Sequence, residues 1–151
     1  MPTYFSGSRA ERRTLDTFIK LTRCTDSVMA RIAERNTIGD LTFSQFAVLE
    51  ALYHLGPLTA GEVGQKVLKS GGNMTLVIDN LERAGLVRRE RDVKDRRVVH
   101  VHLLEAGKEK VEEVLPGHVA ALVDEFKVLS AKEQETLGEL CRKLGRGRRS
   151  E

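Results

Sequence analysis

Cysteine is scarce in this chain, and long uncharged hydrophobic runs are absent. Only two of the 151 residues are cysteines, Cys24 and Cys141. They stand far apart and outside any Cys-x-x-Cys spacing, which argues against a zinc site and fits a reducing compartment. No apolar segment approaches the about 18 residues that a membrane-spanning helix needs, and residues 1–8 lack the layout of a signal peptide. We therefore expect a cytoplasmic protein that does not enter a membrane.

Signatures of catalysis are missing as well. The chain shows no Ser/His/Asp set, no paired-carboxylate pattern and no nucleotide-binding loop, because the Gly71-Gly72 pair is too short to be one. His100 and His102 share one face of a predicted strand, but no carboxylate or cysteine stands at helical spacing with them. We therefore expect no enzyme, no metal site and no cofactor.

The composition is that of a folded protein of one domain. The residues are 40% hydrophobic and 31% charged, which is ordinary for a chain with a full-sized core. The net charge of +3 is by itself a weak sign of a nucleic-acid partner. The distribution of the charge is stronger evidence for such a partner, since residues 83–97 hold seven basic side chains against three acidic ones. We expect this cluster to contact phosphates and interpret the second basic group, at residues 142–149, as a solvated face.

Helix signals fill the first part of the chain. Apolar residues recur at three- and four-residue steps over residues 11–36, which predicts a long helix, and Gly39 ends the segment. Thr-x-x-Gln at Thr42 and Thr-x-x-Glu at Thr59 are capping boxes, and each predicts the beginning of a further helix.

The centre of the chain predicts a helix followed by a β-hairpin. Ser70 is a suitable N-cap for a helix that runs to Ala84, and Gly85 is a left-handed stop. Residues 86–92 and 97–104 predict two strands joined by a short turn. A short helix, a turn, a second helix and a basic hairpin, in this order, predict a winged helix-turn-helix that holds duplex DNA.

Helical patterns return after the hairpin. Residues 105–129 carry one that Pro116-Gly117 interrupts, where we expect a kink or, alternatively, a break. Ser130 opens a last capping box, and Gly145 should end the last helix. The terminal helices are apolar over broader faces than one small core needs, which indicates a homodimer built from both ends of the chain. The expected fold is mainly α with a small β wing, a winged helix-turn-helix flanked by N- and C-terminal dimerisation helices.

The start of the second helix of the motif should enter the major groove. Asn can bind adenine through two hydrogen bonds, and Thr or Leu can touch a thymine methyl group. The glycines leave room for close approach of the backbone to a phosphate. The alternative is capping and solvation alone. The residues expected to contact DNA here are Ser70, Gly71, Gly72, Asn73, Thr75 and Leu76.

The hairpin should form the wing. Arg96 at its tip is expected to enter the minor groove or to bind phosphate, and a solvated turn is the alternative. Arg88, Arg89 and Lys94 are expected to make phosphate contacts that position the protein without reading sequence. Asp95 is expected to shape the turn.

Three segments resemble the MarR family of bacterial transcription regulators. They are residues 41–49 (LTFSQFAVL), 70–87 (SGGNMTLVIDNLERAGLV) and 92–97 (DVKDRR). The last resembles the family's wing pattern, Asp-Pro-x-Asp-Arg-Arg, after which a glycine follows at Gly107. The resemblance covers nearly the whole chain. It implies one MarR-type domain over residues 1–151, with the DNA-binding portion at 38–104 and dimerisation helices at 11–37 and 105–145.

The resemblance also implies roles for single positions. The second arginine of the wing pattern is structural in the family, so Arg97 should pair with Asp79 or Glu82 and fix the wing to the helix. Val93 stands where the family has proline, and Leu104 replaces a threonine before the fifth helix. These departures imply a looser wing tip and a missing helix cap.

Control by a small molecule is the norm in the family, which implies a small aromatic or phenolic effector. Cys24 is a candidate sensor of oxidants or electrophiles, as in peroxide- and quinone-sensing members, and a buried structural cysteine is the alternative. The usual pocket lies between the dimer helices and the winged unit, and ordinary core packing is the alternative role for its residues. The candidates to line it are Phe18, Phe46, Tyr53 and His54.

The expected function is a sequence-specific DNA-binding transcription regulator. It would be a ligand- or redox-responsive repressor that binds a palindromic operator as a homodimer. Residues 115–119 and 126–134 resemble the branch of the family that responds to quinone and aromatic-electrophile stress. The alternative is a winged-helix interaction or architectural module without operator specificity, which competition with random DNA would distinguish.

Overall fold

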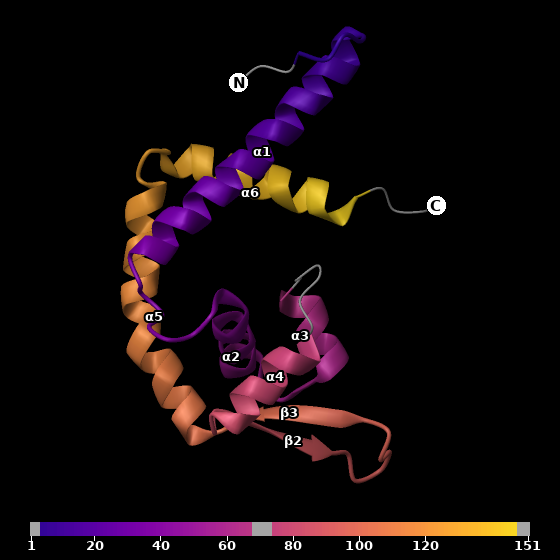
Figure 1. Cartoon of the computed structure of the whole chain (residues 1–151), viewed down its shortest axis with the longest axis vertical. Helices are drawn as coiled ribbons and strands as arrows, with labels where there is room; N and C mark the ends of the chain where they lie inside the picture. The colour runs from indigo at the N-terminus through magenta and orange to yellow at the C-terminus, as the bar shows by residue number, and fades with distance from the viewer. Residues whose placement is uncertain (1–3, 68–73, 148–151) are drawn as a thin grey trace. The chain divides into compact units, whose positions relative to one another are not determined.

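The computed structural model describes residues 4–67 and 74–147. Over these residues, the chain forms helices and a small antiparallel sheet (Figure 1), and the predicted fold class is confirmed. The helices are α1 (Arg9–Glu34), α2 (Phe43–Leu55), α3 (Ala60–Val67), α4 (Met74–Arg83), α5 (Glu105–Phe126) and α6 (Ala131–Arg146). The strands are β1 (Leu58–Thr59), β2 (Val87–Arg91) and β3 (Val99–Leu103).

The chain forms two compact units. The central unit is residues 37–119, and the terminal unit combines the chain up to residue 36 with the chain from residue 120 onwards. Helix α5 contributes to both. No helix among the described residues is both long and apolar enough to cross a membrane.

Side-chain caps fix where the helices of the central unit begin. The Thr42 hydroxyl accepts a hydrogen bond from the Gln45 N–H at 3.1 Å, and Gln45 Oε1 accepts one from the Thr42 N–H at 3.0 Å. Thr59 and Glu62 make the same reciprocal pair at 3.2 and 2.8 Å. Both predicted capping boxes are confirmed. Such a cap typically contributes about 1 kcal/mol, because it satisfies N–H groups that the helix leaves without partners.

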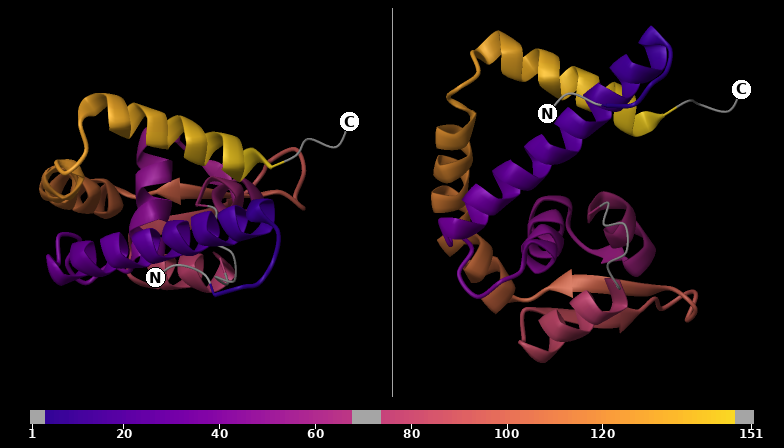
Figure 2. Two further views of the ribbon diagram at one scale, coloured as in Figure 1. Left: turned by 90° about the horizontal axis from the view of Figure 1, so that it is seen from above. Right: turned by 45° about the horizontal axis from the view of Figure 1, so that its top comes forward.

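The core of the central unit joins α2, α3, α4 and the first part of α5 to the sheet. Helices α2 and α3 contact β3, and α4 contacts β2 (Figure 1 and Figure 2). Gly85 follows α4 with φ +73°, as predicted, so the chain turns there and enters β2. The buried side chains that meet are Val48, Leu49, Leu52, Val63, Ile78, Leu81, Val87, Val101 and Val111.

The sheet has three antiparallel strands in the order β1-β3-β2. Val87 pairs with Leu103 and Arg91 with Val99, so the two long strands form the predicted hairpin. Val101, in the middle of β3, is fully buried. The two-residue strand β1, which the sequence analysis did not predict, pairs with the other edge of β3.

Gly107 lets α5 approach the hairpin closely. A Cβ atom added there would overlap the carbonyl oxygen of Leu86 and the Leu103 side chain. The same Leu86 carbonyl accepts a hydrogen bond from the Leu104 N–H at 3.0 Å. Only glycine fits this position, which gives a physical reason for the glycine after the wing.

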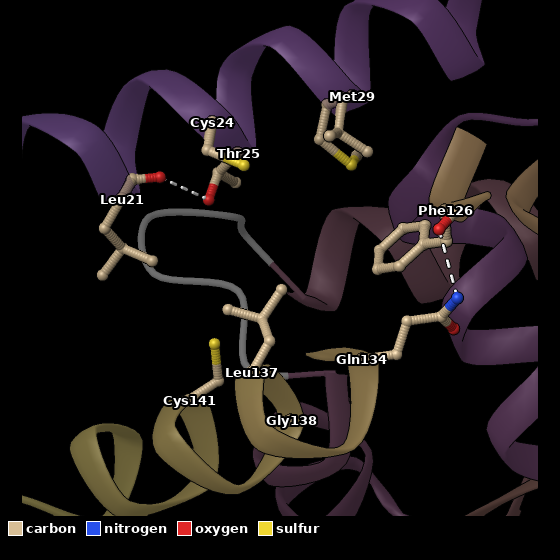
Figure 3. Close-up of a pocket in the computed structure, with 10 residues that line it drawn as sticks. Leu21, Cys24, Thr25, Met29, Phe126, Gln134, Leu137, Gly138 and Cys141 are labelled. Atoms are coloured by element: carbon tan, nitrogen blue, oxygen red, sulfur yellow. Dashed lines mark hydrogen bonds between the residues drawn. The ribbon is translucent and has the colours of Figure 1, made fainter. Parts of the chain in front are cut away.

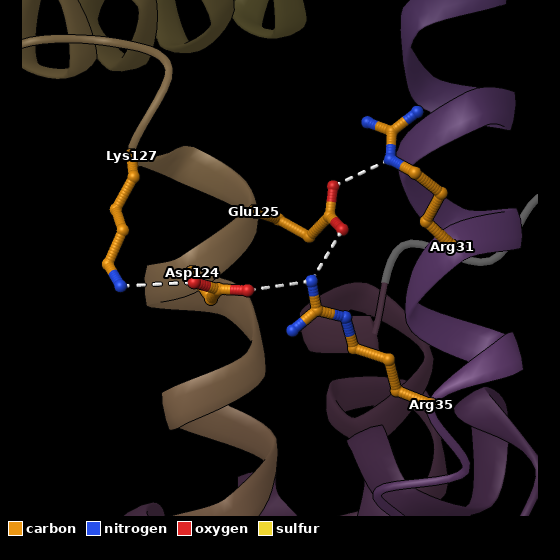
Figure 4. A network of polar contacts seen from close by, with 5 residues as sticks. All are labelled: Arg31, Arg35, Asp124, Glu125 and Lys127. Carbon is orange, nitrogen blue, oxygen red and sulfur yellow. Dashed lines mark hydrogen bonds and ion pairs between the residues drawn. The ribbon is translucent and has the colours of Figure 1, made fainter.

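In the terminal unit, four charged side chains connect α1 to α5 (Figure 4). Arg31 Nε lies 2.6 Å from a Glu125 carboxylate oxygen, and Arg35 Nη2 lies 2.9 Å from both Asp124 and Glu125. Hydrogen bonds from Lys127 and Arg35 lower the pKa of Asp124, and the bond from Arg31 lowers the pKa of Glu125. The network holds α1 against the end of α5.

Several predicted boundaries differ from the structure. Helix α1 begins at Arg9 rather than near residue 11, because Ser8 and Glu11 form an unforeseen capping box. Helix α5 continues through Pro116, so the alternative of a break there is wrong. Helix α6 ends at Arg146 rather than at Gly145, and Gly147 takes the left-handed conformation with φ +62°. The predicted Ser130–Glu133 capping box is confirmed.

Candidate nucleic-acid interface

Helix α4 divides its side chains between the core and the surface. Ile78 and Leu81 are buried in the central unit, whereas Thr75 and Leu76 are exposed at the start of the helix. This is the end that a recognition helix presents to the major groove. Of the predicted contacts, Ser70, Gly71, Gly72 and Asn73 lie outside the described residues. Contact of Thr75 and Leu76 with bases stays a prediction.

Arg89 connects the wing to α4. Its guanidinium lies 2.6 Å from Asp79 Oδ1 and 3.1 Å from Glu82 Oε1, and it donates a hydrogen bond to the Thr75 carbonyl at 3.3 Å. The Arg89 backbone N–H also donates to Glu82, at 2.7 Å. Three acceptors on one helix therefore engage this side chain, and little of it remains to bind a phosphate.

The predicted partner of Asp79 and Glu82 was Arg97, and that pairing is wrong. Arg97 instead donates from Nε and Nη2 to the two carboxylate oxygens of Asp95, each at 3.1 Å. The pairing of Arg89 could not be predicted from the sequence, because the choice of partner depends on how β2 lies against α4. The acidic pair itself was a usable signal of such a contact, since Asp79 and Glu82 are three residues apart and share one face of a helix.

Two aspartates order the wing tip. Asp92 Oδ1 accepts the N–H groups of Lys94 and Asp95 at 2.8 and 2.9 Å, which closes a tight Asx turn. These backbone hydrogen bonds lower the pKa of Asp92. The Arg97 side chain, together with the Arg97 N–H, lowers the pKa of Asp95. Both carboxylates therefore stay ionised at neutral pH. Although Val93 stands where the family has proline, hydrogen bonds to Asp92 hold the turn.

The basic cluster separates into engaged and available cations. Arg88 pairs with Glu90, and Arg91 donates to the Arg96 carbonyl at 2.9 Å. The side chains of Lys94 and Arg96 are exposed and make no hydrogen bond or ion pair with any residue that the structure describes. The wing tip therefore presents two available positive charges on an ordered turn.

The predicted effector-pocket residues differ in their surroundings. Phe46 is buried and packs edge-on against His118, with ring centroids 4.9 Å apart. The Tyr53 hydroxyl donates to Glu112 at 3.1 Å, and His54 is exposed. These residues belong to the central unit, whereas Phe18 is exposed in the terminal unit. The pocket stays a prediction.

His118, for which no role was predicted, is buried beside Phe46. Its Nδ1 atom lies 2.8 Å from the Thr37 hydroxyl. Burial lowers the pKa of His118, and the charge of Glu50 offsets this only in part. An isolated histidine after Pro116-Gly117 offers no pattern from which its burial could be predicted.

Neither cysteine is buried. Cys24 and Cys141 are both exposed, so the alternative that Cys24 is a buried structural cysteine is wrong. Among the described residues, no three His, Cys, Asp or Glu side chains are grouped as metal ligands would be.

A helix-turn-helix followed by an ordered cationic wing defines a class of protein, the winged DNA-binding transcription regulators. Comparison with known proteins gives the family. The MarR family model matches residues 41–99. The regulator MhqR of Bacillus subtilis is 32% identical over 88% of this chain and 92% of its own length. The chain belongs to the MarR family.

Two further proteins illustrate the similarity. The regulator YkoM of Bacillus subtilis is 42% identical over 68% of this chain and 66% of its own length. The structure of BpsR from Bordetella bronchiseptica is 26% identical, with a TM-score of 0.79 over 96% of this chain and 98% of that one. MhqR and YkoM are named helix-turn-helix transcriptional regulators. Nothing in these comparisons supports the alternative of an architectural module.

Proposed function

We propose that this regulator is a repressor that binds a palindromic operator as a homodimer and releases it when a small aromatic or phenolic effector binds. The observation that carries the proposal is the wing tip, where Lys94 and Arg96 extend from a turn fixed by Asp92. An ordered cation loses little conformational freedom when it meets a phosphate or enters the minor groove. The repressor would act in the cytoplasm, where it meets DNA.

Helix α6 supports the homodimer. It is capped at both ends, yet none of its residues is buried. Leu137, Leu140 and Leu144 are 38%, 58% and 64% exposed. Burying one leucine side chain contributes about 1.5–3 kcal/mol, so a second copy that covers this edge would stabilise the helix. Twofold symmetry would then place two α4 helices on successive turns of a palindrome.

The effector class is proposed by analogy. Regulation of the DNA binding of BpsR by 6-hydroxynicotinic acid is described for that protein. We propose an effector of similar chemistry for this chain, a small hydroxylated aromatic compound. Tyr53, which is only partly buried in the central unit, is the aromatic contact proposed for it.

A competition assay tests the proposal. A labelled fragment that carries the inverted repeat beside the protein's own gene is challenged with random duplex DNA. A repressor should prefer its operator by at least about a thousandfold. Equal competition by random DNA would leave only an architectural role.

Sedimentation equilibrium tests the dimer separately. Replacing Leu140 with Glu should convert the dimer to a monomer and weaken operator binding. Replacing the exposed Val128, which lies outside α6, with Glu is the matched control and should leave the dimer intact. A wild-type monomer at micromolar concentration would contradict the proposal.

A further inference from the structure

The terminal and the central unit each hold a cavity, and the two differ in the polar groups that a ligand could meet. The cavity of the terminal unit lies between α1, α6 and the end of α5, and both cysteines line it (Figure 3). The Thr25 hydroxyl there donates to the Leu21 carbonyl at 3.0 Å. The Gln134 amide donates to the carbonyl oxygens of Phe126 and Leu129, both at 3.1 Å. The hydroxyl and amide donors of this cavity are therefore used within the protein.

The cavity of the central unit lies where α2 begins and α4 ends. Its volume of about 310 Å³ is within the range of small-molecule sites. Leu41, Leu81 and Leu86 form its apolar wall, and Leu81 is buried. Asp40, from the segment before α2, and Lys110, from α5, add one charge of each sign. This cavity is distinct from the predicted effector pocket, because none of the residues predicted for that pocket lines it.

The two charged side chains of the central cavity form an ion pair that a ligand can open. Lys110 Nζ lies 3.3 Å from Asp40 Oδ1, and 26% of the Lys110 side chain and 87% of the Asp40 side chain are exposed. An ion pair this exposed contributes little to stability, so its exchange for the charges of a ligand costs little. Because the two charges cancel, the cavity favours a ligand that is neutral overall but carries both signs.

Two carboxamide side chains at the central cavity have donors to spare. Gln45 Oε1 accepts the Thr42 N–H at 3.0 Å, and Asn80 Oδ1 accepts a hydrogen bond from Arg83 at 3.2 Å. The side-chain N–H groups of Gln45 and Asn80 donate to no residue within 4–67 or 74–147. Both side chains are half-buried. A carboxylate in the cavity would give these N–H groups the acceptor that they lack, which is favourable for half-buried donors.

The ends of two helices at this cavity carry partial charges of opposite sign. Helix α2 begins at Phe43 and α4 ends at Arg83, and the first end of a helix is partly positive and the last end partly negative. The first turn of α2 carries no acidic side chain that would neutralise it. Arg83, in the last turn of α4, offsets part of the negative charge there. The backbone therefore adds most to the binding of a carboxylate, at the α2 end.

We propose that this cavity binds a small aliphatic α-amino acid as its zwitterion. The carboxylate of the ligand pairs with Lys110 and its ammonium group with Asp40, so that the ligand replaces the ion pair. Its aliphatic side chain lies against the wall of Leu41, Leu81 and Leu86 and is removed from water there. Leu81 belongs to the last turn of α4, so the bound amino acid contacts the recognition helix. The site goes beyond the proposed function, and its occupancy is measured without DNA.

The test compares L-leucine with two analogues that each lack one of its charges, in NMR titrations of the full-length protein. Isocaproate lacks the ammonium group, and isopentylamine lacks the carboxylate. L-Leucine should bind with a dissociation constant in the millimolar range or tighter, and each analogue at least about tenfold more weakly, because it loses charge-assisted hydrogen bonds. Absence of saturable binding at millimolar L-leucine, or equal binding of the three compounds, would overturn the proposal.

Variants locate the binding within the chain, and the dispersion of their amide signals shows that each is folded. Lys110→Met should weaken the binding of L-leucine and isocaproate by about tenfold but not that of isopentylamine. Asp40→Asn should weaken L-leucine and isopentylamine but not isocaproate. Lys108→Met is the matched control, because Lys108 is in the same helix, pairs with Glu112 at 4.0 Å and does not line the cavity. It should bind all three compounds like the wild type. Wild-type binding of L-leucine in Lys110→Met and Asp40→Asn would overturn the site.

Discussion

The Nη2 atom of Arg89 lies 2.6 Å from the Oδ1 atom of Asp79, and this ion pair joins the wing strand β2 to helix α4. The same guanidinium donates to the carbonyl of Thr75, a residue predicted to contact DNA. The arginine predicted from the sequence to contact phosphate thus holds the recognition helix. Within the basic cluster, Lys94 and Arg96 supply the available positive charge, and Arg89 orients helix α4.

Replacing Arg89 with Ala should weaken operator binding by about tenfold, because α4 loses three contacts that fix its orientation. The free energy of unfolding should fall by about 1 kcal/mol, since the pairs are partly exposed. Arg88→Ala is the matched control for stability, because Arg88 pairs with Glu90 on its own strand. Chemical denaturation and gel-shift titration measure the two effects. An Arg89→Ala protein that binds its operator like the wild type would refute the orienting role.

Replacing Gly107 with Ala should destabilise the central unit by about 2 kcal/mol or more, since the new methyl group overlaps the Leu86 carbonyl. Gly117→Ala in the same helix is the control. A Cβ there meets nothing within 4 Å, and alanine should stabilise the helix by about 0.5–1 kcal/mol. Urea titration measures both. Equal effects of the two substitutions would show that α5 does not approach the hairpin this closely.

The stability of the central unit should depend on pH through His118. Burial lowers the pKa of this histidine in the folded protein below 6.5, so the unfolded chain binds more protons as the pH falls past 6.5. The stabilisation that comes from burying neutral His118 is therefore complete above pH 6.5. It decreases as the pH falls from 6.5 toward the pKa that His118 has in the folded protein. In His118→Phe the free energy of unfolding should vary less over this window, with His54→Phe as the exposed control. An unchanged pH profile in His118→Phe would contradict the assignment.

Much of the fold could be predicted from helix caps and turns, because these depend only on residues that are close together in the sequence. The capping boxes at Thr42, Thr59 and Ser130 each need only a hydroxyl and a carboxylate or amide three residues later. The left-handed stop at Gly85 is equally local. Strand β1 was missed because two residues carry no periodicity and its pairing with β3 is set by tertiary packing.

The candidate site was less predictable, since it depends on which partners meet across the fold. Seven basic residues looked alike in the sequence, and the structure separates Arg89 and Arg97 from Arg96 by their acidic neighbours. The burial of His118 and the shared cavity of Cys24 and Cys141 likewise follow from contacts between distant segments.

The salt dependence of operator binding tests the central claim most directly, that Lys94 and Arg96 are the available cations of the wing. Arg96→Ala and Lys94→Ala should each weaken binding and lower the slope of log K against log salt by about one. Arg97→Ala, which loses the Asp95 pair, should keep the wild-type slope. A slope unchanged in Arg96→Ala and Lys94→Ala would contradict the claim that the wing binds DNA through these two side chains.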